Sequence, residues 1–549
     1  MRKKRAIILW SICLAGILFF TGQRLYEECF APVPFAYKEM GVALLEDTSF
    51  LETLEKRTAE TNELVFFEQV LLPYDSSEHM LYLSQGTESE KWLGELSAGG
   101  DYFLCSALED GWQDKNTAIA QNHIVTLWVL GEDHYYEFQM AVSGMPVIAM
   151  TTTREEEPEP VDYEVDPDAY IYDSETRYYG TMNVFDPVFC ESDYDIYQLH
   201  MRYHYKGNSS KSFEKKGYSL KLLDYEEEKV NVPLLGMRSD NNWKLNALYT
   251  DENRIREITA SQVWEEFDAA NEEVDEPGPR MEYVELIVDN DYKGLYCLVE
   301  PVDEKKLELT EEDTLYKIIN WTIPEEEDML EAMNNGWKVQ QSIRIRYPDE
   351  ITDYESVWSP IIDYLNTFYV NESINYEEAG EKINISNYSD YFMFLMTMTI
   401  SDNGYKNIYY VADKTRNGYQ MRVIPWDLDF SFGNVFDYNA SDNCVFSTDL
   451  EGVYVETALP RLKIANPEEI GPEFYERYCS YRESFLSTEH ICTLLTANQQ
   501  YIVKTGALAR ENTRWPECGV TDDIRELLEF QKNRMAWLDD YFLNWSLGY

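Results

Sequence analysis

The chain is poor in positive charge. Its 46 lysines and arginines stand against 101 aspartates and glutamates, which gives a formal net charge of −55 over 549 residues. A surface of this kind repels a phosphate backbone, so the composition argues against a nucleic-acid partner. The acidity indicates a solvated surface or adaptation to salt, and it is compatible with a need for divalent cations.

Metal-binding cysteine motifs are also missing. The nine cysteines include no CxxC pair, and no histidine accompanies them in metal-ligand spacing, which argues against a zinc site. Eight cysteines lie outside the N-terminal apolar segment, an even number that permits disulfides, but free buried thiols are equally compatible. No internal repeat is visible.

The N-terminus has the pattern of a targeting segment. MRKKR is followed by the apolar run AIILWSICLAGILFFTG, residues 6–22, which is typical of a signal peptide or a short membrane anchor. No small-x-small cleavage site or lipobox stands out, which favours an uncleaved transmembrane anchor over residues 1–29 with its basic end in the cytoplasm. We therefore expect the rest of the chain outside the cell membrane, or secreted if the segment is cleaved.

A chain of this length exceeds one ordinary core, so we expect a large domain and a smaller one. Residues 45–144 alternate in hydrophobicity between frequent turn signals, which predicts a small β-sandwich-like module with a binding or spacing role. The larger domain, residues 145–549, begins with the apolar strand MPVIAMTTT. The acidic, proline-containing run at 154–168 is expected to form an exposed loop within it.

The larger domain should change character along its length. Strands dominate residues 177–310, where a hairpin turns at DNDYKG and TDENRIREITASQVWEEF forms an amphipathic helix with Thr250 or Asp251 as N-cap. Helices take over after residue 350, among them the apolar NYSDYFMFLMTMTI. The sequence thus predicts an α+β, bilobal fold with a β-rich and a helical lobe and a cleft for a nucleotide.

One loop in the helical half has a spacing that suits phosphoryl transfer. SDNGYKNIYY places Asp402 and Asn407 five residues apart, as protein kinases space a catalytic aspartate and a metal-binding asparagine. IPWDLDFSFG then supplies Asp427 and Asp429 as further metal ligands. Because aspartate and asparagine are also ordinary turn residues, this spacing alone does not decide between a site and a turn.

A lysine cluster in the β-rich half would complement these carboxylates. In YKGNSSKSFEKKGYSLKLLD the backbone amides of GNSS could approach a phosphate, and Lys215, Lys216 and Lys221 follow on or before a strand. The alternative is a hairpin turn with solvated lysines.

Several segments together resemble the CotH kinases, a family named for a bacterial spore-coat protein kinase. The segments occur in family order over roughly residues 145–545 and are KGNSSKSFEKKGYSLKL, NWKLNALYTDENRIRE, YVELIVDNDYKGLYCLVEPVDE, SDNGYKNIYY and IPWDLDFSFG. The resemblance implies an atypical protein-kinase-like fold that uses ATP and Mg²⁺ or Mn²⁺ to phosphorylate Ser or Thr of a protein.

The resemblance also implies roles for single residues. Asp402 is similar to the catalytic aspartate and Asn407 to its metal-binding companion. Asp427 is similar to the aspartate of the kinase DFG motif, and Asp429 either shares the metal or caps the turn. Lys216 is expected to contact phosphate as a catalytic residue.

Other residues are implied to bind the nucleotide. Lys215 or Lys221 could exchange roles with Lys216, and Arg256 either contacts phosphate or ties its helix to nearby carboxylates. The implied nucleotide-binding residues are Asn208, Ser209, Ser210, Lys215, Lys221, Arg256 and Glu300. This chain has Lys206 where the family often has arginine, which keeps the charge but loses bidentate geometry.

Three functions follow as hypotheses. The first is an extracytoplasmic, membrane-anchored protein kinase acting on surface or coat proteins. The second is a kinase-like surface or coat protein that binds or organises without turnover. The third, a calcium-dependent carbohydrate-binding protein, rests only on acidity and the many tyrosines.

Overall fold

The computed structural model describes residues 35–39, 41–87, 95–108, 115–158, 175–189, 194–207, 209–437, 444–451 and 457–548. The chain divides into two compact units, one of residues 1–83 and 88–142 and the other of residues 84–87 and 143–549. The predicted membrane segment lies outside the described residues. Within the described ranges, no helix is long and apolar enough to cross a membrane.

The first unit consists mainly of short strands. An eight-stranded sheet has the order β1-β2-β9-β10-β11-β7-β6, with β3 paired to β11, and a second sheet has the order β5-β4-β8. In β10 every second residue is buried, as in a strand with one face on a core. The elements are β1 (Phe35–Glu39), β2 (Val42–Leu45), η1 (Ser49–Thr53), β3 (Glu55–Arg57), β4 (Val65–Phe67), β5 (Val70–Leu71), β6 (Tyr74–Asp75), β7 (Met80–Ser84), β8 (Leu96–Ala98), β9 (Phe103–Ala107), α2 (Lys115–Ala120), β10 (Ile124–Leu130) and β11 (His134–Ser143).

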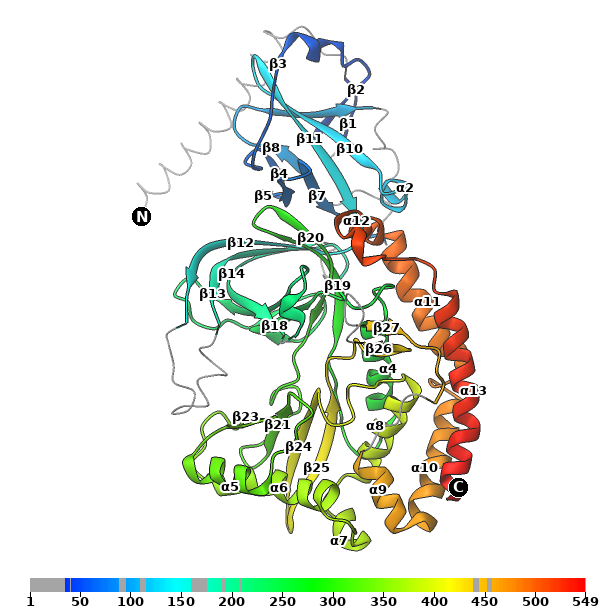
Figure 1. The fold of residues 1–549 in the computed structure, drawn as a ribbon. Helices are drawn as coiled ribbons and strands as arrows, with labels where there is room; N and C mark the ends of the chain where they lie inside the picture. Colours follow the sequence, from blue (N-terminus) through cyan, green and yellow to red (C-terminus); the bar gives the residue numbers. More distant parts are fainter. Residues whose placement is uncertain are drawn as a thin grey trace, which may run out of the picture. The chain divides into compact units, whose positions relative to one another are not determined.

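Seven strands of the second unit close into a barrel with the order β12-β13-β14-β15-β18-β20-β19 (Figure 1). Alternate residues such as Tyr203, Leu220 and Trp243 fill its interior, so their sequence neighbours point outward. The strands are β12 (Val147–Glu156), β13 (Arg177–Asp186), β14 (Asp195–Lys206), β15 (Gly217–Leu223), β18 (Asn242–Asn246), β19 (Met281–Val288) and β20 (Asp291–Val299), with η2 (Ser209–Ser212), β16 (Val232–Pro233) and β17 (Ser239–Asp240) between them.

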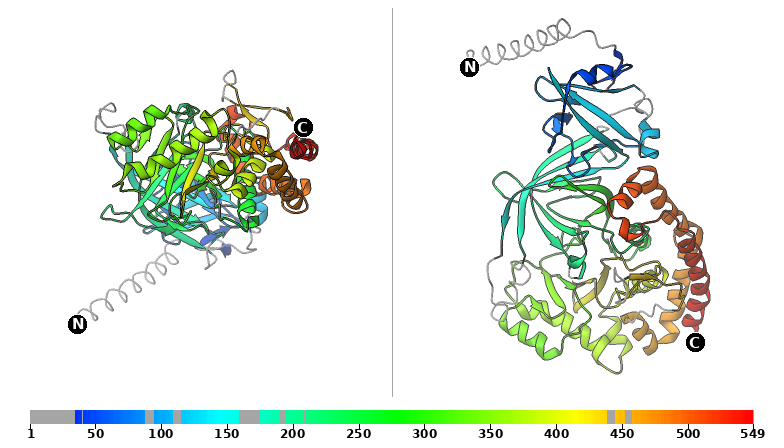
Figure 2. Two further views of the ribbon diagram at one scale, coloured as in Figure 1. Left: turned by 90° about the horizontal axis from the view of Figure 1, so that it is seen from below. Right: turned by 45° about the horizontal axis from the view of Figure 1, so that its top comes forward.

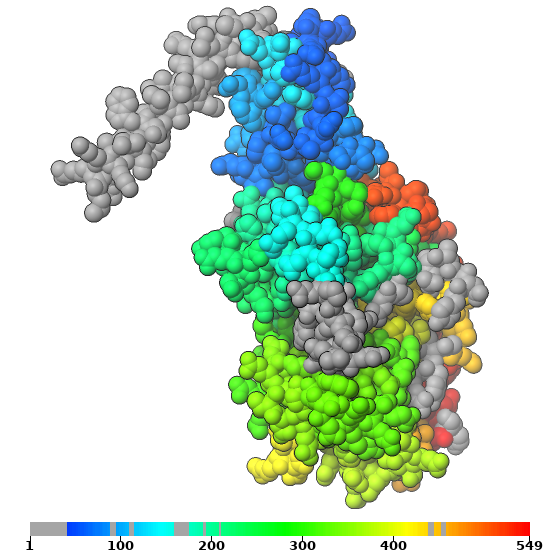
Figure 3. Space-filling view, turned by 60° about the vertical axis from the view of Figure 1, so that its left-hand side comes forward, coloured from blue at the N-terminus to red at the C-terminus, as the bar shows by residue number. Residues whose placement is uncertain are grey.

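A second sheet follows the barrel in sequence, with the antiparallel order β22-β23-β21-β24-β25. On one face of the molecule, the surface of this part adjoins that of the barrel (Figure 3). Its elements are β21 (Thr314–Ile318), α5 (Glu326–Asn335), β22 (Val339–Gln340), β23 (Ile343–Tyr347), α6 (Tyr354–Leu365), η3 (Asn366–Val370), α7 (Tyr376–Gly380), α8 (Ile385–Thr397), β24 (Ile408–Thr415) and β25 (Gly418–Pro425).

Helices complete the second unit. Helix α13 packs against α10 and α11 (Figures 1 and 2). The remaining elements are α4 (Arg256–Ala270), β26 (Asn434–Phe436), β27 (Cys444–Phe446), α9 (Ala458–Ala465), α10 (Pro467–Arg482), α11 (Thr488–Lys504), α12 (Ala507–Arg514), η4 (Pro516–Cys518) and α13 (Arg525–Leu547). One large apolar core joins α4, α8, the second sheet and these helices.

The mixed α and β composition predicted from sequence is confirmed, but two details differ. The helix predicted from residue 250 begins only at Arg256. Asp251 is not its N-cap residue, yet its Oδ2 accepts the backbone N–H groups of Ile255 (2.6 Å) and Arg256 (2.7 Å). A carboxylate upstream of the helix therefore satisfies its first amides.

The expectation that helices take over after residue 350 is only partly right. Strands β24 and β25 form a hairpin immediately after the loop 401–407. Both strands contain runs of buried residues. Periodicity cannot distinguish such a run from a piece of buried helix.

Candidate active site

The loop that carries Asp402 and Asn407 links the buried helix α8 to strand β24. The fully buried Asn403 holds this loop in place. Its side-chain Nδ2 donates to the backbone carbonyl oxygens of Asn407 (2.9 Å) and Trp426 (2.7 Å). Its backbone carbonyl oxygen accepts from the Tyr391 hydroxyl (2.7 Å). One amide side chain thereby joins the loop to the end of β25, where the second acidic element begins.

The carboxylate of Asp402 accepts hydrogen bonds from three donors. Lys406 Nζ and Asn407 Nδ2 both donate to Oδ2 at 2.8 Å, and Trp321 Nε1 donates to Oδ1 at 3.2 Å. Burial raises the pKa of Asp402 and the charge of Asp427 adds to this, while Lys406 opposes it. A fixed carboxylate with a raised pKa has the properties of a general base.

Asn407 and Asp427 both adopt left-handed backbone, with φ of 56° and 61°. Backbone hydrogen bonds hold the Asn407 turn: its N–H donates to the carbonyl of Ile318, and its carbonyl accepts from the N–H of Trp426, both at 3.1 Å. Non-glycine residues in this conformation are uncommon and concentrate at functional sites, and asparagine and aspartate tolerate it best.

Asp427 and Asp429 follow β25 and share their surroundings with other acids. Thr250 Oγ1 donates to Asp429 Oδ2 at 3.1 Å. Burial raises the pKa of Asp429 well above its usual value, and the charges of Asp427, Glu257 and Asp402 raise it further.

A lysine of the barrel reaches the acidic cluster. Lys206, at the end of β14, forms an ion pair with Asp427 Oδ1 at 3.5 Å and donates to Asn246 Oδ1 at 2.5 Å. Asn246 in turn donates to the buried Glu257 Oε1 at 2.5 Å. Burial would raise the pKa of Asp427, but the charges of Lys206 and other lysines hold it below its usual value.

Further cations gather beside Lys206 because of the strand register. In the barrel, Ser219 of β15 is paired with Lys244 of β18, and Lys221 with Asn242. All four residues alternate with residues that fill the interior, so they share the outer face. Burial and the neighbouring cations lower the pKa of Lys221 to about 8 and that of Lys244 to about 7.

The second sheet contributes two more cations. Lys317 of β21 lies over the ring of Trp426, 4.8 Å from its centroid. Burial lowers the pKa of Lys317 well below its usual value, and the positive charges of Arg346, Lys206 and Lys244 lower it further. Lys206 also lies over this ring, 5.5 Å from its centroid, and in a chain of net charge −55 five basic residues gathered in this way form a candidate site for a polyanion. We call Lys206, Lys221, Lys244, Lys317 and Arg346 the basic cluster.

The acidic residues fit a divalent cation that is shared with a ligand. Asn407, Asp427 and Asp429 offer only oxygen donors from carboxylates and an amide, the chemistry that Mg²⁺ and Mn²⁺ prefer. Among the described residues, no three His, Cys, Asp or Glu side chains converge to form a metal site by themselves. Magnesium typically uses one or two carboxylates together with substrate phosphates, which agrees with this arrangement.

Two predicted lysines have partners outside the acidic cluster. Lys216 Nζ donates to the carbonyl of Lys211 at 2.6 Å, whereas the lysines that act on Asp427 are Lys206, Lys317 and Lys406. Lys215 is fully buried and ion-paired to Glu511 at 2.7 Å. The structure thus gives Lys215 a structural role in place of the predicted contact with nucleotide.

Arg256 and Glu300 also have structural partners. Arg256 is buried, pairs with Asp251 and donates to Asn253 Oδ1 at 3.1 Å, so the structure supports the interpretation that it ties its helix to neighbouring carboxylates. Glu300 pairs with Arg238 at 2.7 Å and with Lys306 at 3.3 Å.

The GNSS stretch is described only in part. Asn208 lies outside the described residues, and the side chain of Ser209 is not described. Gly207 has φ of 102°, and a Cβ at this position would lie 1.8 Å from Ser210 Oγ. The turn therefore requires glycine.

Sequence reasoning missed several residues of the site. Lys244 could have been found from period-two alternation, because it alternates with the apolar Trp243 and Leu245 on one strand. Lys317, Arg346 and Trp321 carry no local signal, because only the folded chain brings Lys317 to Asp427, Trp321 to Asp402, and Arg346 to Lys317 and Lys244.

Comparison with protein families gives a match to the family described as CotH kinase protein over residues 203–538, more than half of the chain. The matched range contains Asp402, Asn407, Asp427, Asp429 and Lys206. None of the curated proteins compared with the chain matches it.

Proposed function

Because the chain belongs to the CotH kinase protein family, we propose that it is an atypical protein kinase that transfers the γ-phosphate of ATP to Ser or Thr of a protein. The observation that carries the proposal is the ion pair between Lys206 and Asp427. It joins the basic cluster to the acidic residues and so gives one site both phosphate-binding and metal-binding groups. The bilobal, kinase-like arrangement expected from sequence is part of this proposal.

The residues suit the chemistry of phosphoryl transfer, which depends on positioning and on charge. The basic cluster attracts the phosphates of ATP. The substrate hydroxyl oxygen attacks the γ-phosphorus, the bond from phosphorus to the β–γ bridging oxygen breaks, ADP leaves, and the hydroxyl proton passes to Asp402. A divalent cation held by Asn407, Asp427 and Asp429 would offset the charge on the phosphate oxygens.

Location and substrate belong to the proposal as well. The basic and apolar pattern of residues 1–22 supports a single-pass anchor with the kinase outside the membrane. The substrates would then be surface or coat proteins.

The direct test is transfer of label. The purified full chain is incubated with γ-labelled ATP and Mg²⁺ or Mn²⁺, together with candidate surface proteins. Label on Ser or Thr of protein supports the proposal. Nucleotide binding without transfer of label would instead favour the kinase-like binding or structural protein.

Asp427→Asn should weaken both nucleotide affinity and the transfer rate, each by about tenfold or more, because a carboxylate that holds the metal acts in the ground state and in the transition state. High Mg²⁺ or Mn²⁺ should restore part of the activity. The measurement is kcat and KM for ATP over a metal titration. Unchanged KM and kcat at limiting metal would contradict the assignment of Asp427 as a metal ligand.

Nucleotide binding should take up protons in mildly alkaline solution. Lys244 has a pKa of about 7 and Lys221 of about 8 in the free protein, and bound phosphates favour the charged amines and raise both values. Protons therefore bind with the ligand above these pKa values, and affinity falls as pH rises. Calorimetry at about pH 8.5 in buffers of different ionisation enthalpy measures the uptake.

Lys244→Met should reduce this proton uptake, since it removes a group whose pKa of about 7 lies below the pH of the measurement. Binding heats that do not depend on the buffer in the unaltered chain would show that the basic cluster does not receive the phosphates.

A further inference from the structure

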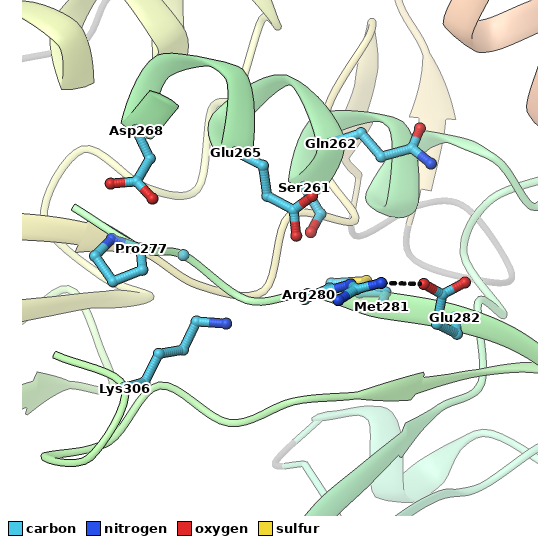
Figure 4. A pocket seen from close by; sticks show the side chains of 10 residues that line it. Ser261, Gln262, Glu265, Asp268, Pro277, Arg280, Met281, Glu282 and Lys306 are labelled. Atoms are coloured by element: carbon cyan, nitrogen blue, oxygen red, sulfur yellow. Dashed lines mark hydrogen bonds and ion pairs between the residues drawn. The ribbon is translucent and has the colours of Figure 1, made fainter. Parts of the chain in front are cut away.

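A pocket of about 400 Å³ lies between α4 and the segment that leads into β19 (Figure 4). Its lining includes Glu265 and Asp268 of α4, and Arg280, Glu282 and Lys306 from the chain that follows. None of the candidate active-site residues belongs to the lining. A volume of this size falls in the range of small-molecule sites.

The wall opposite α4 is held close to the helix. Trp264 Nε1 donates to the carbonyl of Glu276 at 2.7 Å, and Ser261 Oγ donates to the carbonyl of Pro279. A Cβ on Gly278 would lie 2.2 Å from Trp264 Cδ1, so only glycine permits this close approach. The pocket is therefore bounded by a fixed backbone segment.

The cations of the lining already have carboxylate partners. Arg280 pairs with Glu282 at 3.2 Å, and Lys306 pairs with Glu300, outside the lining, at 3.3 Å. Among the described residues, Glu265 and Asp268 are the carboxylates of the lining that form no ion pair, although the charges of Arg280 and Lys306 act on Glu265 and that of Lys306 acts on Asp268.

Glu265 and Asp268 lie one helical turn apart, and Figure 4 shows both side chains extending from α4 toward the pocket. Among the described residues, Glu265 has no hydrogen bond or ion pair, and the Asp268 carboxylate accepts only the backbone N–H of Glu276, at 2.6 Å. Burial raises the pKa of both carboxyl groups, although Arg280 and Lys306 lie close enough to oppose this for Glu265.

We propose that this pocket binds a small organic cation, an amine or guanidinium compound, whose charged group pairs with Glu265 and Asp268. The apolar side chain of Met281 lies in the same lining and can contact the body of the ligand. A bare metal ion fits less well, because no three ligating side chains converge among the described residues. The site is independent of the proposed kinase reaction.

Binding should also be detectable along the helix. Helix α4 forms one wall of the pocket. A bound cation that pairs with both Glu265 and Asp268 would therefore stabilise the helical turn that carries them. Amide hydrogen exchange over residues 256–270 should slow when the pocket is filled.

The test is a calorimetric titration of agmatine and putrescine into the full chain at low ionic strength. We expect saturable binding at one site, weakened by on the order of tenfold or more in the double variant Glu265→Gln, Asp268→Asn. Glu272→Gln removes the same charge from an exposed position outside the pocket and should bind as the unaltered chain does.

The control separates site binding from general attraction to an acidic protein. The double variant removes only two of 101 acidic residues, so non-specific uptake would be nearly unchanged by it. Equal binding by the double variant and the unaltered chain, or no saturable binding, would overturn the proposal. If the double variant unfolds, Glu265→Gln alone provides the same comparison, since Glu265 makes no hydrogen bond that folding would lose.

Discussion

Asp402→Asn is expected to lower the rate of phosphotransfer by on the order of 10² or more, since loss of a general base typically costs that much. Asparagine preserves the shape of the side chain but cannot accept the proton of the attacking hydroxyl. The affinity for ATP should change little, because the donors to the Asp402 carboxylate are Asn407, Lys406 and Trp321 and none of them belongs to the basic cluster. The measurement is kcat and the dissociation constant of ATP under saturating metal.

A matched control is Asp522→Asn, which makes the same change at an exposed position and should leave the rate unaltered. Circular dichroism and thermal unfolding of both variants exclude misfolding as the cause. Full activity of Asp402→Asn in a metal-replete assay would mean that Asp402 is a turn residue, and its spacing from Asn407 would then have no catalytic meaning.

The largest expected effect on stability comes from Glu511→Gln. The fully buried Glu511 of α12 accepts from Lys215 (2.7 Å) and Arg254 (2.9 Å) and from the backbone N–H of Leu295 (2.8 Å). Removing its charge leaves two buried cations without their anion, which typically costs about 3–5 kcal/mol. Urea denaturation should show this loss as a lower midpoint with an unchanged m-value.

Two comparisons make the stability prediction specific. Glu517→Ala, at an exposed position nearby, should change the unfolding free energy by no more than about 0.5 kcal/mol. Adding Lys215→Met to Glu511→Gln removes one of the two buried cations that have lost their anion. The double variant should recover part of the lost unfolding free energy. If Glu511→Gln has the stability of the unaltered chain, the buried network does not exist as described.

The stability result also bears on the predicted role of Lys215. A lysine that binds phosphate must meet solvent or ligand, whereas Lys215 is enclosed with Glu511 and Arg254. The sequence could not reveal this, because Lys215 and Glu511 are 296 residues apart. Adjacent lysines in a turn have the same local pattern whether they contact phosphate or a distant glutamate.

Local sequence was sufficient where one segment carries its own geometry. The spacing of Asp402 and Asn407 places two side chains of one loop in contact, and the hydrogen bond between them follows. The hairpin predicted at DNDYKG is also present, because apolar strands flank a polar turn sequence, but its turn is only Asp289 and Asn290 since β20 already begins at Asp291.

The sequence by itself determined the family, the mixed α and β composition and the two acidic elements, since these depend on residue types at short spacing. Only the tertiary structure determined which lysines and arginines lie beside the two acidic elements. Lys206 and Lys317 lie far apart in the chain, and the barrel and the second sheet bring both to Asp427. Because strand register and the packing of distant elements fix the positions of charges, Lys215 of the predicted motif is buried against Glu511, while Lys206 meets the carboxylate of Asp427, which lies in a distant part of the chain.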